Sequence, residues 1–306
     1  MIRASIDIGS NSVLLLAAEL DDSGNKILKE ILNLSFITSL GKDLDKTKQF
    51  HPDSMKATFE ALTDYKKQLE KINIDPSEVL ITATEASRVA TNAIEFYAKV
   101  KNELGFSVVL ITSKGEAYYT ALGVVSGVNS DESELVIMDI GGASTELIHI
   151  QVAPFKILST VSLPVGSVRA TDWRKDLIFE ERMMALLNQD FSTYFTKSLI
   201  CVAGSMTSLA AMFMGHNLYD DKKIDGLTIK FSSFKEFSSS LQNTNTENLL
   251  LQFPHLGKRA PMVAAGAIVA EMIGDKLKIE NMKISTRGLR YGTLIQGEID
   301  GQFTIG

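Results

Sequence analysis

The chain has 306 residues, 45% of them hydrophobic, which is enough for two folded domains with apolar cores. Its net charge of −6 argues against broad binding to nucleic acid or to an anionic membrane, and no apolar stretch approaches the ~20 residues that span a bilayer. Cys201 is the only cysteine, and a strand predicted from Ile2 leaves no room for a signal peptide, so we expect a cytoplasmic protein without disulfide bonds.

The first half predicts three strands and then alternating helices and strands. Short apolar runs with alternating polar residues mark the strands, and apolar residues three or four positions apart mark the helices. The predicted strands are 2–6, 13–20, 26–40, 79–83 and 107–111, and the predicted helices are 53–72, about 88–104 and one ending at Leu122. A Gly-, Ser- and Asp-rich stretch near 123–134 indicates a boundary or hinge.

The second half repeats this plan. Its predicted strands are 135–138, 145–152, 155–163, 199–202 and 282–285, and its predicted helices are 179–195, one opened by 203–207, 262–277 and one from Leu289. Residues 220–252 are polar and weakly periodic, with one short helix around Phe234 and Phe237. We therefore expect an α/β protein of two domains, 1–123 and 124–306, each a mixed sheet flanked by helices. The last helix, about 288–300, is allowed to pack back on the first domain.

Two turns are near-copies of each other and stand at equivalent places in the two halves. The first reads Asp-Ile-Gly-Ser-Asn-Ser at 7–12, and the second reads Asp-Ile-Gly-Gly-Ala-Ser at 139–144. Consecutive N–H groups in such a turn can bind an anion, and an adjacent carboxylate can hold a cation. One such turn alone is ordinary hairpin chemistry. The repetition predicts a phosphate gripped by both turns.

Further motifs occur in a fixed order along the chain, at 83–88, 116–117, 122–124, 162–169, 204–211, 258–260 and 285–292. Together with the two turns, they resemble the exopolyphosphatase/guanosine pentaphosphate phosphohydrolase (Ppx/GppA) family of the actin-like ATPase superfamily. The resemblance implies two actin-like (ribonuclease H-like) domains with a cleft between them. It also implies a hydrolase of inorganic polyphosphate or guanosine pentaphosphate, assisted by Mg²⁺ or Mn²⁺ and linked to the stringent response. A homodimer is an open possibility, and we expect neither a nucleic-acid nor a membrane partner.

The resemblance assigns roles to individual residues. Glu116 stands where the family has its catalytic carboxylate, which would orient the attacking water and accept its proton. Arg88 would clamp phosphate oxygens with two parallel bonds. The implied metal ligands are Asp7, Asp139 and Glu146. The implied phosphate-binding residues are Gly9, Ser10, Asn11, Ser12, Gly141, Gly142, Ala143, Ser144, Gly204 and Ser205.

Several of these residues, and the pair Lys258-Arg259, also have a simpler interpretation. Glu116 would favour a helix dipole, Arg88 would be a solvated helix charge, and Glu146 would face water. Gly204-Ser205 would be a helix N-cap, and Lys258-Arg259 would be surface charges.

Three positions depart from the family pattern. Ala143 replaces a usual glycine, Lys114-Gly115 precede Glu116 where the family usually has an acidic neighbour, and Ser205-Met206 replace a commoner Thr-Ala. Two other functions stay open. One is an ATP-dependent kinase or ATPase of the same superfamily, and the other is a non-catalytic sensor of polyphosphate or an alarmone, which Ala143 and Lys114-Gly115 keep open. If the protein is a hydrolase, its short two-domain form predicts distributive action on long polyphosphate.

Overall fold

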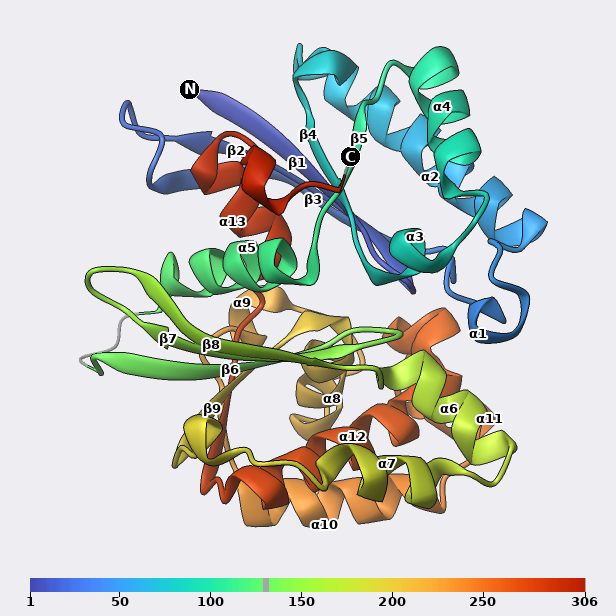
Figure 1. The fold of residues 1–306 in the computed structure, drawn as a ribbon, viewed down its shortest axis with the longest axis vertical. Helices are drawn as coiled ribbons and strands as arrows, with labels where there is room; N and C mark the ends of the chain where they lie inside the picture. The colour runs from blue at the N-terminus through green and yellow to red at the C-terminus, as the bar shows by residue number, and fades with distance from the viewer. Residues whose placement is uncertain (129–131, 306) are drawn as a thin grey trace. The chain divides into compact units, whose positions relative to one another are not determined.

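The computed structural model describes residues 1–128 and 132–305, which form two compact units (Figure 1). Unit 1 comprises Met1–Gly127 and the residues from Gly288 onward, and unit 2 comprises Val128–Arg287. The predicted division after residue 123 falls inside helix α5 (Ser113–Val125). The hinge predicted near 123–134 includes residues 129–131, which lie outside the described residues. No helix within 1–128 or 132–305 is long and apolar enough to cross a membrane.

Unit 1 is built on a five-stranded mixed sheet in the order β3-β2-β1-β4-β5. The first three strands are antiparallel neighbours, whereas β4 and β5 run parallel to β1. The strands are β1 (Ile2–Ile8), β2 (Ser12–Leu20), β3 (Ile27–Ile37), β4 (Leu80–Ala83) and β5 (Val108–Leu110).

Helices cover both faces of this sheet, and the alternation within β2 shows why. Leu15 and Ala17 are buried with α2 (Pro52–Glu70) and α4 (Ala93–Leu104), whereas Leu16 and Ala18 are buried with α13 (Leu289–Gln296). Successive strand residues point to opposite faces, so a strand buried on both sides is apolar throughout. Helix α5 packs against α13, and α1 (Leu44–Thr47) and α3 (Glu85–Val89) are short connections.

Unit 2 contains a six-stranded mixed sheet in the order β10-β11-β9-β6-β7-β8. Its strands are β6 (Glu134–Ile140), β7 (Thr145–Gln151), β8 (Lys156–Leu163), β9 (Ser198–Val202), β10 (Thr228–Lys230) and β11 (Asn281–Ile284). Its helices are α6 (Ser167–Lys175), α7 (Phe179–Leu187), α8 (Ala203–Phe213), α9 (Asp221–Ile224), α10 (Phe231–Gln242), α11 (Thr246–Gln252) and α12 (Ala260–Leu277). A continuous apolar core joins these helices to the sheet through residues such as Met138, Cys201 and Val269.

The two units share one plan, as the sequence predicts. In each, three antiparallel strands are followed by parallel strands that continue the sheet on the side of the first strand. The predicted fold class, an α/β protein of two mixed sheets flanked by helices, is confirmed.

Two predicted helices are wrong in their extent. The helix expected at about 88–104 is divided between α3 and α4, because the Asn92 side chain bonds to the backbone of Phe50, with Phe50 N at 2.9 Å from Asn92 Oδ1. The helix expected at 179–195 ends at Leu187. There Asp190 accepts a hydrogen bond from Ser192 N at 2.8 Å, which favours a turn over a helix. Helix α6 is absent from the sequence-based expectations.

Candidate phosphate site

Most of the predicted site residues of unit 1 follow the carboxyl ends of three adjacent parallel strands, whereas Asp7 lies inside β1 and Ser12 begins β2. Ile8, Ala83 and Leu110 are register partners at the ends of β1, β4 and β5. The first turn, α3 and the start of α5 come directly after them. This edge of an open α/β sheet is where ligands bind. The topology therefore places Gly9, Arg88 and Glu116 at one edge of one sheet.

Unit 2 uses the same edge of its own sheet. β6, β9 and β11 are parallel neighbours. The second turn follows β6 at Ile140, and Gly204-Ser205 follow β9 at Val202. The two groups of phosphate-binding residues predicted for this unit thus follow the carboxyl ends of two adjacent parallel strands, at the same edge of the sheet.

The first turn, residues 9–12 (turn 1), accepts backbone hydrogen bonds from the segment after β3. Gly9 N donates to Ser12 O at 2.9 Å and closes the turn. Gly41 N donates to Ser10 O at 2.7 Å, and Thr38 N donates to Asn11 O at 3.0 Å. Consecutive carbonyl groups of turn 1 are therefore bonded within unit 1.

The second turn, residues 141–144 (turn 2), closes in the same way, with Gly141 N donating to Ser144 O at 3.0 Å. Here the first turn of α6 holds the carbonyls. Ser167 N donates to Gly141 O at 2.9 Å and Val168 N donates to Gly142 O at 2.9 Å. Arg169 binds the turn twice, through its N–H to Gly142 O at 3.1 Å and through Nη1 to Ala143 O.

These bonds decide where the N–H groups of the turns point. In a planar trans peptide, the C=O and the following N–H point in opposite directions. The N–H groups of Asn11 in turn 1 and of Gly142 and Ala143 in turn 2 therefore point away from the segments that bind the carbonyls. Within each turn, backbone N–H groups that point away from the rest of their own unit suit an anion.

Glu116 lies in the first turn of α5, where Thr112 caps the helix by accepting Gly115 N at 3.1 Å. The residue is only 9% exposed. Its Oε2 accepts a bond from Arg88 Nη2 at 2.9 Å, and Arg88 Nη1 also donates to Ile111 O at 2.8 Å. The dipole and solvated-charge interpretations are therefore insufficient, because the two side chains are each only 12% exposed and are bonded to each other.

Arg88 also binds Glu85, a residue that was not among the predicted site residues. Its Nη2 donates to Glu85 Oε2 at 3.0 Å. Burial by itself would lower the pKa of Arg88, but the charges of Glu116 and Glu85 raise it above its ordinary value. The i,i+3 spacing of Glu85 and Arg88 was a visible signal of this pair, whereas the contact with Glu116 joins residues 28 positions apart.

Two acidic residues of unit 2 stand opposite each other across β6 and β7. Asp139 and Glu146 are register partners, so their side chains project from the same face of the sheet. Glu146 is 2% exposed, and its Oε1 accepts a bond from Ser162 Oγ at 2.7 Å. The interpretation of Glu146 as a residue that faces water is therefore wrong.

Two facing carboxylates suit a hard cation that takes its other ligands from phosphate and water. Asp139 and Glu146 are donors of this type, and they stay predicted ligands. No group of three or more His, Cys, Asp or Glu side chains within residues 1–128 and 132–305 could hold a metal by itself. Asp7, in unit 1, stays a predicted ligand.

The start of α8 brings Gly204 and Ser205 beside α6 and Arg259. The N-cap of α8 is Val202, so the N-cap interpretation of Gly204-Ser205 is wrong. Ser205 Oγ instead donates to Ser167 Oγ at 3.0 Å. A Cβ on Gly204 would lie 2.7 Å from Arg259 Nη2, so the guanidinium covers the backbone there. Arg259 is therefore not a remote surface charge.

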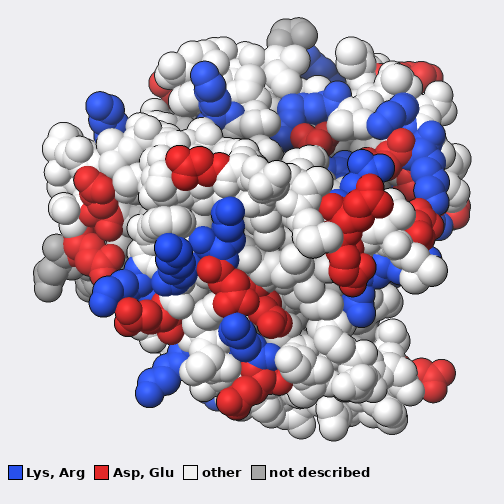
Figure 2. All heavy atoms as spheres, turned by 60° about the horizontal axis from the view of Figure 1, so that its bottom comes forward, with Lys and Arg blue, Asp and Glu red and all other residues white. Residues whose placement is uncertain are grey.

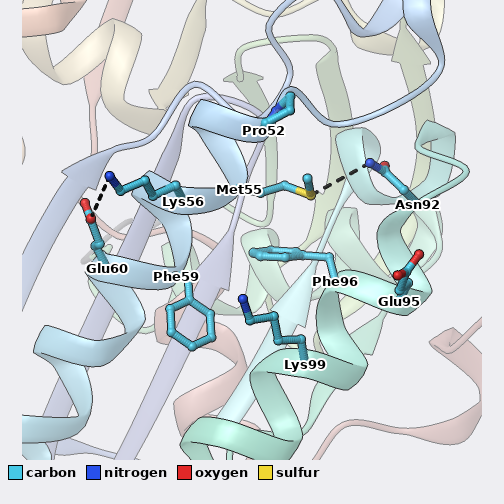
Figure 3. A pocket seen from close by; sticks show the side chains of 9 residues that line it. All are labelled: Pro52, Met55, Lys56, Phe59, Glu60, Asn92, Glu95, Phe96 and Lys99. Atoms are coloured by element: carbon cyan, nitrogen blue, oxygen red, sulfur yellow. Dashed lines mark hydrogen bonds and ion pairs between the residues drawn. The ribbon is translucent and has the colours of Figure 1, made fainter.

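A separate pocket of about 550 Å³ lies between α2 and α4 in unit 1 (Figure 3). Met55, Phe59 and Phe96 give it an apolar lining, and Lys56, Glu60, Glu95 and Lys99 provide both signs of charge. None of the predicted site residues lines it. Its apolar character does not suit a polyphosphate.

A family model, described as the Ppx/GppA phosphatase family, matches residues 19–299. The chain belongs to this family. Three curated relatives support the match. A bifunctional 3-dehydroquinate synthase/phosphatase of Fusobacterium nucleatum is 29% identical over 97% of this chain and 46% of its own length. Exopolyphosphatase 2 of Mycobacterium tuberculosis is 26% identical over 94% of this chain and 96% of its own length. Guanosine-5'-triphosphate,3'-diphosphate pyrophosphatase of Vibrio cholerae is 25% identical over 96% of this chain and 59% of its own length.

The chain thus spans about half of the Fusobacterium relative and nearly all of the mycobacterial one. A crystal structure of the Aquifex aeolicus member of the Ppx/GppA family is also similar, with a TM-score of 0.77 and 29% identity over 97% of each chain. The family predicted from the motifs is confirmed. The roles of the individual site residues stay predictions.

Proposed function

We propose that the protein is a hydrolase that removes the terminal phosphate of inorganic polyphosphate or of guanosine pentaphosphate. Family membership supports a phosphatase, and the two named activities of the mycobacterial and Vibrio relatives supply the two substrates. The observation that carries the proposal in this chain is the buried Glu116 carboxylate, fixed by Arg88 at the sheet edge that also bears turn 1.

The chemistry requires a water aligned with the terminal phosphorus and a base that accepts its proton. Glu116 is suited to that role, because Arg88 fixes one of its oxygens and the capped start of α5 fixes its backbone. The N–H groups of the turns would bind phosphate oxygens. The family pattern and this anchoring together favour Glu116 over the other carboxylates of unit 1.

Asp139 and Glu146 are the residues that would hold Mg²⁺ or Mn²⁺ in unit 2. The ion, when bound, would neutralise charge on the phosphate oxygens and polarise the phosphorus. Acidic and basic side chains are interspersed over the face shown in Figure 2, and the net charge is −6. A polyanion would therefore depend on local positive charge from the ion and from arginines such as Arg88 and Arg259.

Phosphate release from a substrate panel tests the proposal. We expect release from polyphosphate or guanosine pentaphosphate with Mg²⁺ or Mn²⁺, and little release when EDTA is present. Faster release from ATP than from both substrates would favour the kinase or ATPase alternative. Tight binding of polyphosphate without turnover would favour the sensor.

Asp139→Asn and Glu146→Gln are expected to raise the Mg²⁺ concentration for half-maximal activity about tenfold or more, because each removes a full negative charge beside the ion. Calorimetric titration with Mn²⁺ should show the same loss without requiring turnover. Glu180→Gln, which neutralises an exposed acid of α7, is the control and should leave both titrations unchanged. Wild-type metal titrations in both site variants would remove this pair from the metal site. Asp7→Asn tests the third predicted ligand in the same way.

A further inference from the structure

Both carboxylates that contact Arg88 use the same nitrogen. Nη2 lies 2.9 Å from Glu116 Oε2 and 3.0 Å from Glu85 Oε2, and Nη1 lies 2.8 Å from Ile111 O. A guanidinium carries five N–H groups, two of them on each terminal nitrogen and one on Nε. The two hydrogens of Nη2 are therefore both committed to carboxylates.

This arrangement blocks every two-point contact with a new anion. A guanidinium presents two forks to an oxyanion, one formed by Nη1 and Nη2 and the other by Nε and Nη2. Each fork includes a hydrogen of Nη2. A phosphate can therefore receive two parallel bonds from Arg88 only after Glu85 or Glu116 releases its own.

Glu85 is the carboxylate that can leave at lower cost. Its side chain is 23% exposed, whereas the side chains of Glu116 and Arg88 are each 12% exposed. It is the first residue of the five-residue helix α3, where water can hydrate the carboxylate once its bond to Arg88 is broken. Glu116 is held in the capped first turn of the longer helix α5.

We propose that Glu85 is a positioning residue that occupies the phosphate-binding fork of Arg88 and is displaced by an incoming phosphate group. The inference rests on the proposed function for its substrate, since it describes how that site is held before phosphate enters. Glu85 keeps the guanidinium aligned next to Glu116 and competes with phosphate for Nη2. The competition lowers the affinity for phosphate, which is also a product of the proposed reaction.

The test is calorimetric titration of the full chain with inorganic phosphate. Glu85→Gln keeps the shape of the side chain but removes its charge, so its bond to Nη2 becomes weaker. We expect the Kd for phosphate to fall roughly three- to tenfold, the range for a charge-assisted bond in a partly exposed site. If the protein is a hydrolase, KM should fall by a similar factor while kcat changes less.

Two comparisons make the result specific. Glu95→Gln neutralises an acid in the first turn of α4 and should leave the Kd unchanged, which controls for net charge. In an Arg88→Gln background, Glu85→Gln should give no gain in affinity. Thermal unfolding of each variant establishes that it is folded.

Phosphate affinity that is equal in wild type and Glu85→Gln would overturn the proposal, and so would absent binding in both. Weaker binding in Glu85→Gln would also overturn it, since it would mean that Glu85 supports the arginine without competing for it. An equal gain in the Arg88→Gln background would place the effect elsewhere. The titration needs no turnover, so a chain that binds phosphate but hydrolyses neither substrate would contradict only the proposed reaction.

Discussion

Replacing Glu116 with glutamine is expected to lower kcat by about 10²- to 10⁴-fold, the usual contribution of a general base. The amide keeps the size of the side chain, and its oxygen can still accept the bond from Arg88 Nη2. It cannot accept a proton from water. Substrate binding should therefore persist, and a direct binding measurement should separate lost chemistry from lost affinity.

The matched control for this variant is Glu95→Gln. Both residues stand in the first turn of a helix in unit 1, so both substitutions remove the same favourable interaction with a helix dipole. Only Glu116 is buried against Arg88. Wild-type kinetics are expected for Glu95→Gln. A Glu116→Gln enzyme that retained more than about a tenth of wild-type kcat would exclude Glu116 as the base.

The strand–turn–strand segments were predictable because their signal is local. Alternating apolar residues specify each strand, and the repeated Asp-Ile-Gly specifies the turn between two of them. The observed turns even close with the same bond, from Gly9 N to Ser12 O and from Gly141 N to Ser144 O. The edge of the sheet that carries the site then follows from the parallel strands, whose carboxyl ends lie together.

The contacts that fix the candidate site residues could not be predicted from the sequence, because they join residues that are far apart along the chain. Nothing near turn 2 indicates that Ser167 and Arg169 bind its carbonyl groups, since these residues follow it by a whole hairpin. The same is true of Arg259 above Gly204. The predicted helix ends were wrong for a related reason, as at Asn92, whose side chain bonds to the backbone of Phe50. Propensity describes neighbours along the chain, whereas tertiary hydrogen bonds override it.

Gly166 is the residue whose substitution is expected to damage turn 2 most. Its backbone, with φ −134° and ψ −178°, is extended and suits any residue, so conformation does not require glycine here. Space does. A Cβ would lie 2.5 Å from the carbonyl carbon of Gly142 and 2.6 Å from the oxygens of Gly141 and Gly142. All three contacts are with backbone atoms, which no side-chain rotation can relieve.

Gly166→Ala must therefore push the start of α6 away from turn 2. That movement stretches the bonds from Ser167 N and Val168 N, both 2.9 Å, and from Arg169 N, 3.1 Å, to the turn carbonyls. Once these carbonyls are released, the N–H groups on the other side of the same peptides lose their fixed direction. We expect kcat/KM to fall about 10²-fold, comparable to the loss of one preorganised donor at a developing charge. We also expect a loss of about 1–3 kcal/mol in the free energy of unfolding, as for overpacking elsewhere.

Urea unfolding and steady-state kinetics of the same preparation separate these two effects. A variant that is still folded at the assay temperature but has lost most of its activity would locate the damage in the turn. Gly301→Ala is the control, because nothing lies within 4 Å of a Cβ at that position. It should match wild type in both measurements. If Gly166→Ala kept wild-type kinetics and stability, the close packing of α6 on turn 2 could not be what directs the N–H groups of the turn, and their role as the phosphate cradle would lose its support.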